Sequence, residues 1–161
     1  MFVGDEHAVI RAAGGTLPGL LEHEPLLTVP RAMARILRTY ERLRHGVASP
    51  GGQISSRLSV LTPLALKAIL DPEPDVFRVL TDEELRPSTE AVTAEAADKG
   101  IPLTPIAAEL AAAAREFDSE IWLGHDRNLP RWALHSDTSL SGVRWRRLSD
   151  LIVPDNVESS N

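Results

Sequence analysis

The chain has 161 residues, enough for a single domain with a hydrophobic core. Its apolar content of 43% and charged content of 25% are typical of globular proteins, and the absence of cysteine excludes disulfides, thiol nucleophiles and cysteine-ligated zinc. No apolar run approaches the roughly twenty residues of a transmembrane helix, and the first residues carry acids where a signal peptide carries positive charge. We therefore expect a cytoplasmic protein with no membrane attachment.

The net charge of −6 is concentrated in one segment. Residues 71–99 hold nine acids and three bases, so acids and bases balance over the rest of the chain. An acidic overall composition therefore does not exclude a local surface that binds anions.

Short apolar strands alternate with helices along the chain. The strands are expected at 2–4, 26–30, 58–61, 120–123 and 143–148. The helices are expected at 7–13, 31–45, 63–70, from Ser88 or Thr89 to Gly100, and after the Thr104-Pro105 cap, with a partly helical stretch at 76–87. Residues 46–53 are expected to form a loop, and residues 154–161 a frayed tail.

This alternation predicts one α/β domain over residues 1–153 with a mostly parallel sheet. In such sheets the ligand site lies beyond the carboxyl ends of the strands. Asp5 follows the first expected strand, and Asp126 lies in the turn after the strand at 120–123. The topology could therefore bring these two carboxylates together.

Two carboxylates at adjacent strand ends would offer the oxygen ligands that Mg²⁺ or Mn²⁺ prefers. A metal held there could generate hydroxide and stabilise the transition state of phosphodiester cleavage. The structural alternative is that Asp5 caps the first helix and Asp126 begins a turn, because both positions favour aspartate for local reasons.

Arginines form a stripe along the helix expected at 31–45. Arg31, Arg35, Arg38 and Arg42 are spaced to share one face, where guanidinium groups could follow a nucleic-acid backbone. The same stripe could dock on an acidic partner, or it could simply be the solvated face of an amphipathic helix. In RWRR (144–147), tryptophan and arginine could stack on single-stranded nucleic acid, although charge on an edge strand is the plainer interpretation.

Several motifs of other protein classes are missing or weak. There is no HxxxH, HxH, GxSxG, GxGxxG or GxxxxGK[ST] sequence to indicate a histidine zinc site, a nucleophile elbow or a phosphate loop. Residues 88–117 could form a helix-turn-helix, but the second helix has few groups to contact bases or phosphates. Arg38 and His45 show the R-x6-H spacing of the all-helical HEPN ribonucleases, which the expected strands argue against.

Three segments resemble PIN-domain proteins in the right order. MFVGDEHAVI is similar to their first strand, acid and helix, and LLTVPRAMARILR to their second strand and helix. GIPLTPIAAELAAAAREFDSEIWLGHDRNL is similar to their distal helix, fourth strand and acid-bearing turn. The resemblance implies a three-layer α/β/α sandwich with a mostly parallel sheet of four or five strands. Many small PIN proteins are VapC-type toxins, which are Mg²⁺-dependent ribonucleases neutralised by an antitoxin.

The family's acids are only partly present. The resemblance implies that Asp5 and Asp126 are metal ligands and catalytic residues. The second family acid would fall near Arg35 and the third at Ala107. Glu109 is the nearest catalytic substitute for the third acid, but two residues rotate a helical side chain by roughly 200°.

Two hypotheses follow from this pattern. The first is a PIN-like metal-dependent ribonuclease with the arginine stripe on RNA, for which the resemblance implies the role of toxin in a toxin–antitoxin pair. The second is a catalytically degenerate PIN-like module that binds RNA or a protein partner, such as an antitoxin, without cleavage. A homodimer is compatible with either hypothesis.

Overall fold

Five short strands form the centre of the molecule. The computed structural model describes residues 1–14, 25–46, 52–74, 76–125, 128–134 and 140–151. The strands are β1 (Phe2–Gly4), β2 (Leu26–Thr28), β3 (Phe77–Val79), β4 (Glu120–Leu123) and β5 (Trp145–Arg147). The helices are α1 (Glu6–Ala13), α2 (Pro30–Arg44), α3 (Gln53–Ser59), α4 (Pro63–Leu70), α5 (Asp82–Asp98), α6 (Pro105–Glu116) and α7 (Leu148–Leu151), with a 3-10 helix η2 (Arg131–Leu134).

The sheet has the strand order β3-β2-β1-β4-β5, and all its neighbouring strands are parallel. Central strand β1 pairs Val3 with Leu27 on one side and with Ile121 on the other. The chain runs outward from β1 to β3 and then returns to the other side of β1 to form β4 and β5. This reversal makes the carboxyl ends of β1 and β4 the topological switch point, where parallel α/β sheets bind ligands.

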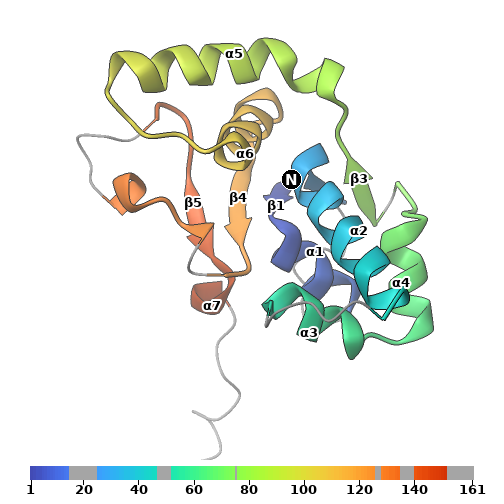
Figure 1. Cartoon of the computed structure of the whole chain (residues 1–161). Helices are drawn as coiled ribbons and strands as arrows, with labels where there is room; N and C mark the ends of the chain where they lie inside the picture. Colours follow the sequence, from blue (N-terminus) through green and yellow to red (C-terminus); the bar gives the residue numbers. More distant parts are fainter. Residues whose placement is uncertain (15–24, 47–51, 75, 126–127, 135–139, 152–161) are drawn as a thin grey trace, which may run out of the picture.

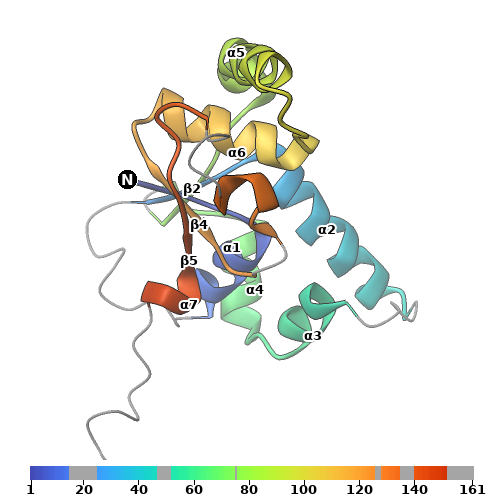
Figure 2. The ribbon, with the colours of Figure 1, turned by 90° about the vertical axis from the view of Figure 1, so that its left-hand side faces the viewer.

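Helices cover both faces of the sheet (Figures 1 and 2). Two clusters of buried apolar side chains lie between these helices and the sheet. Helix α5 supplies Leu85 and Val92 to one cluster, and α6 supplies the four alanines at 111–114. Helices α1 to α4 supply residues such as Val9, Ile36 and Ile69 to the other. The molecule is therefore a three-layer α/β/α sandwich, which confirms the expected fold class and is consistent with the PIN-like architecture.

Threonine caps begin three of the helices. The hydroxyls of Thr62, Thr81 and Thr104 accept hydrogen bonds from the backbone N–H groups of Ala65, Glu84 and Ala107. Proline occupies the first turn after Thr62 and Thr104, where its missing N–H is not needed. The sequence signals for these two helices are thus confirmed.

The predicted strand at 58–61 is wrong. This segment ends α3, where Leu58 is buried and Val60 is 79% exposed, so the short run that suggested a strand belongs to the end of a helix. The third strand is instead β3, which lies in the stretch expected to be partly helical. Helix α5 also begins at Asp82, before the predicted start at Ser88 or Thr89, because Thr81 and Glu84 form a capping box and Pro87 is accommodated within the helix.

No helix within the described ranges is long and apolar enough to cross a membrane. Residues 154–161, expected as a tail, and Asp126, expected as a metal ligand, both lie outside the described residues.

Candidate functional site

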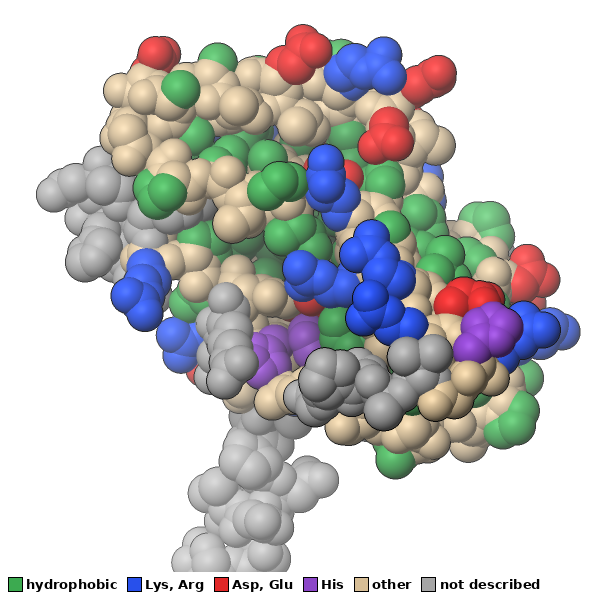
Figure 3. Space-filling model, in the orientation of Figure 1, with side chains coloured by type: hydrophobic (Ala, Val, Ile, Leu, Met, Phe, Trp, Pro, Cys, Tyr) green, Lys and Arg blue, Asp and Glu red, His purple; other side chains and the backbone are tan. Residues whose placement is uncertain are grey.

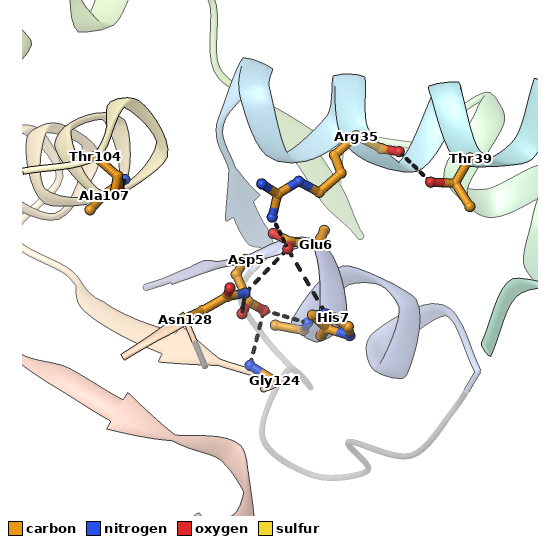
Figure 4. Close-up of polar contacts among 10 residues, drawn as sticks. Asp5, Glu6, His7, Arg35, Thr39, Thr104, Ala107, Gly124 and Asn128 are labelled. Atoms are coloured by element: carbon orange, nitrogen blue, oxygen red, sulfur yellow. Dashed lines mark hydrogen bonds and ion pairs between the residues drawn. The ribbon is translucent and has the colours of Figure 1, made fainter. Parts of the chain in front are cut away.

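Polar side chains gather where β1 and β4 end. Asp5 directly follows β1, Glu6 and His7 open α1, and His125 and Asn128 follow β4. Arg35 reaches this cluster from α2. Figure 4 shows Glu6 between Arg35 and Asn128, with Asp5 beside it. The parallel topology thus brings together residues more than a hundred positions apart.

Asp5 is fully buried and ties α1 to the segment after β4. Its Oδ1 accepts the N–H of Ala8 at 2.8 Å and the N–H of Gly124 at 2.9 Å. Its Oδ2 accepts the side-chain amide of Asn128 at 2.7 Å. The capping role expected of Asp5 is therefore confirmed, and the same carboxylate also holds β4 in place.

The pKa of Asp5 is raised from 3.8 to about 6. Burial is the largest cause because it disfavours the charged form, and the adjacent Glu6 adds like-charge repulsion. The hydrogen bonds from Asn128, Gly124 and Ala8 act in the opposite direction. The effects of burial and of Glu6 on the pKa of Asp5 thus outweigh those of its three hydrogen-bond donors.

Glu6 is a second fully buried carboxylate that sequence reasoning missed. Its Oε1 accepts a hydrogen bond from Nη1 of Arg35 at 2.7 Å and another from Asn128 at 3.2 Å. Its Oε2 has no hydrogen-bond partner among the described residues. An acid at the first position of a helix is usually explained by its favourable interaction with the helix dipole, so Glu6 did not stand out. The signal that could have identified it was its place directly after Asp5.

Arg35 places a permanent positive charge on this carboxylate pair. The resemblance to PIN proteins expects an acid near this position, and the structure instead brings a guanidinium to Glu6. The Arg35 side chain is about half exposed, whereas that of Glu6 is 1% exposed, so the ion pair spans the boundary between core and surface. Arg35 neutralises Glu6 without any other cation.

Ala107 and Glu109 point in different directions from α6. The backbone N–H of Ala107 donates a hydrogen bond to Oγ1 of the capping residue Thr104. In Figure 4, Ala107 lies apart from the carboxylates. Glu109 is buried, with its Oε2 3.4 Å from Nε of Arg31, and it borders a separate hollow beside α5. Burial raises the pKa of Glu109, while Arg31 opposes that rise. Glu109 is thus paired with Arg31 at the start of α2 and makes no contact with Asp5 among those observed.

A cleft of about 720 Å³ separates α2 from the start of α6 and from η2. Arg31, Arg35, Arg38 and Arg131 line it, with Thr104 and Asn128 as further polar groups. No aspartate or glutamate from the described segments is among its lining residues. Figure 3 shows Lys and Arg side chains gathered across the middle of this face. We call this site the arginine cleft; Arg42, the fourth residue of the predicted stripe, is outside its lining.

A smaller pocket of about 340 Å³ adjoins the cleft and shares Arg35 and Asn128 with it. The rings of His7 and His125 lie in this pocket with centroids 5.0 Å apart. Burial is the main reason why the pKa of His7 falls to about 4, although Glu6 acts in the opposite direction. We call this site the histidine pocket.

The described residues are poorly suited to a divalent ion. Both Asp5 oxygens accept N–H donors, and the guanidinium of Arg35 would repel a second cation near Glu6. Within the described ranges no three histidine, aspartate or glutamate side chains are arranged to hold a metal. Because Asp126 lies outside those ranges, the predicted Asp5–Asp126 pair and its Mg²⁺ or Mn²⁺ stay predictions.

Neither the protein-family models nor the curated proteins contain a match to this chain. The PIN resemblance therefore stays a prediction, and the functional argument depends on the site itself.

Proposed function

We propose that this protein is an α/β/α module that binds single-stranded RNA in the arginine cleft and does not cleave it. The observation that carries this proposal is the position of Arg35, whose guanidinium lies on the buried carboxylate of Glu6 and also lines the cleft. The half-exposed side chain of Arg35 thus presents N–H donors to the cleft, while its ion pair with Glu6 disfavours a catalytic metal.

The charge of the cleft suits a phosphate backbone. Three arginines on successive turns of α2 and Arg131 from η2 face one hollow, so a bound chain would contact several guanidinium groups at once. Guanidinium groups bind phosphate with two parallel hydrogen bonds, which favours arginine over lysine at such sites. The acids of residues 71–99 do not add negative charge to the wall of the cleft, since none of those described lines it.

The uncharged wall of the cleft favours single-stranded RNA over an acidic peptide. Ile106, Leu129 and three prolines provide apolar surface beside the arginines. Unpaired bases and riboses can pack on such surface while their phosphates contact the guanidinium groups. An acidic peptide would use the charge but leave much of this wall uncovered.

A metal-dependent ribonuclease is the second candidate. Its specific support is the buried pair of Asp5 and Glu6, because a cation would relieve the repulsion that helps to raise the pKa of Asp5. Oε2 of Glu6 has no hydrogen-bond partner among the described residues and would be a further ligand atom on this hypothesis. On this hypothesis Asp126 would complete the site, and a toxin–antitoxin role would follow from the PIN resemblance.

Binding is tested by fluorescence anisotropy with a labelled single-stranded RNA of mixed sequence. The double variant Arg31→Ala/Arg38→Ala should weaken binding at least about tenfold, because each removed guanidinium loses a phosphate contact. Arg42→Ala is the matched control from the same helix and should change Kd less than about threefold. Equal affinity of the double variant and the wild type would refute the arginine cleft as the RNA site.

A further inference from the structure

The arginines of the arginine cleft differ in what lies behind them. The side chains of Arg31 and Arg35 each contact a buried carboxylate, yet they remain 61% and 49% exposed. Those of Arg38 and Arg131 are exposed and form no ion pair or hydrogen bond with any described residue. Two guanidinium groups of the cleft are therefore held by acids of the core, and two are not.

Glu109 holds Arg31 from helix α6. Its Oε2 lies 3.4 Å from Nε of Arg31, and its carboxylate also accepts a hydrogen bond from the backbone N–H of that residue. Val29, the N-cap residue of α2, has no side-chain group that could accept this bond. Glu109 thus fixes both the backbone and the side chain of Arg31, and it places a carboxylate at the positive end of the helix dipole.

Glu6 holds Arg35 in a comparable way from helix α1. Its Oε1 accepts a hydrogen bond from Nη1 of Arg35 at 2.7 Å. Figure 4 shows the guanidinium of Arg35 directed from α2 toward this carboxylate. A guanidinium group has five N–H donors, so a single bond to Glu6 leaves most of them uncommitted.

A carboxylate behind an arginine changes how that arginine binds a ligand. An arginine that moves freely in solvent loses rotamer freedom when a phosphate fixes it, and this loss weakens binding. A guanidinium that the protein already restrains has less freedom to lose. Its planar fork can meet two phosphate oxygens in a defined orientation, which a lysine ammonium cannot do.

We propose that Glu109 and Glu6 are positioning residues of the arginine cleft. They hold Arg31 and Arg35, respectively, as preorganised forks for the phosphate groups of RNA. The two other arginines of the cleft contribute their charge. The inference rests on the proposed function, since it concerns the same cleft and the same ligand, and it implies that lysine can replace only some of the arginines.

Replacement by lysine tests this division. Arg31→Lys and Arg35→Lys should each weaken binding of the labelled single-stranded RNA at least about fivefold, because lysine keeps the charge and loses the fork. Arg38→Lys and Arg131→Lys are the matched controls and should each change Kd less than about twofold. Equal effects of all four substitutions would overturn the inference.

Two variants of Glu109 test the positioning role itself. Glu109→Ala removes the support of Arg31 and should weaken RNA binding at least about threefold, even though it also removes a negative charge near the cleft. Glu109→Gln keeps an oxygen that can accept the backbone N–H of Arg31, so it should bind RNA at least as tightly as the wild type. Tighter binding by both variants would mean that the carboxylate acts only through its charge, and would refute a positioning role.

The loss of affinity in Glu109→Ala should depend on Arg31. In a double-mutant cycle, Glu109→Ala should change Kd less than about 1.5-fold in an Arg31→Ala background and should keep its full effect in an Arg38→Ala background. A merely structural role would lower the melting temperature, measured for each variant, without this selective coupling. Losses of equal size in the two backgrounds would contradict the inference.

NMR relaxation of the arginine side chains tests preorganisation in the absence of RNA. The ¹⁵Nε order parameters of Arg31 and Arg35 should exceed about 0.6, and those of Arg38 and Arg131 should fall below this value. Glu109→Ala should lower the value for Arg31 and leave that for Arg35 unchanged. Equally low order parameters for all four arginines of the wild type would overturn the inference.

These outcomes distinguish the inference from the proposed function. RNA binding that is lost in Arg31→Ala/Arg38→Ala but tolerates lysine at every arginine of the cleft would overturn the positioning role and leave the cleft intact. Absence of RNA binding by the wild type would refute the proposed function, and the role of the two carboxylates in RNA binding with it.

Discussion

Asp5 and His7 are two buried groups whose pKa values move in opposite directions. The pKa of Asp5 is raised to about 6, and that of His7 is lowered to about 4. Burial is the main cause for both, because it disfavours the carboxylate of one and the imidazolium of the other. The charged forms of Asp5 and of the imidazole are therefore both disfavoured inside the fold.

These shifts have opposite consequences for stability between pH 4 and 6.5. Between pH 3.8 and about 6, Asp5 is protonated more in the native state than in the unfolded state. Its contribution to the free energy of unfolding is therefore present below pH 3.8 and is lost as the pH rises through about 6. Between about pH 4 and 6.5, His7 is protonated more in the unfolded state than in the native state. Its contribution to the free energy of unfolding is therefore present above pH 6.5 and is lost as the pH falls through about 4. The two contributions partly cancel in the wild type.

Substitution should reveal each contribution by itself. Relative to the wild type, His7→Gln should become less stable as the pH rises from 4 to 6.5, and Asp5→Asn more stable, each by up to about 3 kcal/mol. Urea unfolding at several pH values measures both slopes. Slopes of the same sign for the two variants would contradict these pKa assignments.

The residue scale also shows what sequence reasoning could and could not predict. Asp5 was predictable because an acid directly after a strand lies at the carboxyl edge of the sheet, and its capping position was confirmed. The roles of Glu6 and Asn128 were not predictable, because each depends on contacts between segments about thirty or more residues apart. Only the completed topology brings Arg35 to Glu6.

At the scale of elements, Gly124 packs tightly against the start of α1. A Cβ atom added to Gly124 would lie 2.5 Å from Cβ of His7 and 2.6 Å from the backbone N of Ala8. Backbone atoms cannot move aside as the end of a flexible side chain can. The N–H of Gly124 also donates to Asp5, so glycine at this position allows the segment after β4 to reach α1.

Gly124→Ala should therefore destabilise the protein by about 3 kcal/mol, because the methyl group overpacks the junction and pulls the N–H away from Asp5. Gly14→Ala is a suitable control, since its added Cβ would have no contact closer than 3.4 Å and should change stability by less than about 0.5 kcal/mol. Thermal or urea unfolding gives both values. If Gly124→Ala were as stable as Gly14→Ala, the junction would be less tightly packed than described.

The elements themselves were predictable where local chemistry is decisive. Threonine followed by proline identified the starts of α4 and α6, since cap and first-turn preferences act within a few residues. The third strand was misplaced because LSVL (58–61) and FRV (77–79) are both too short for periodicity to identify a strand, and pairing with β2 identifies only the second. Strand assignment thus depended on tertiary contacts that periodicity does not contain.

At the scale of the whole molecule, the sheet order places one cleft and one pocket at the switch point of the strands. The alternation of strands and helices predicted a mostly parallel α/β sheet and the edge of the sheet at which a site would form, whereas the three-layer sandwich was implied by the PIN resemblance. The arginine stripe was also visible in the sequence, although only three of its four members line the cleft. The charge around the carboxylates was not predictable, because it depends on the ion pair between Glu6 and Arg35.

The central claim is that RNA is bound and left intact. The most direct test incubates a labelled single-stranded RNA with excess wild-type protein in Mn²⁺, then measures anisotropy and RNA length in the same sample, alongside Asp5→Ala. We predict high anisotropy with the wild type and full-length RNA throughout. Mn²⁺-dependent cleavage by the wild type that Asp5→Ala abolishes would contradict this account and establish the ribonuclease.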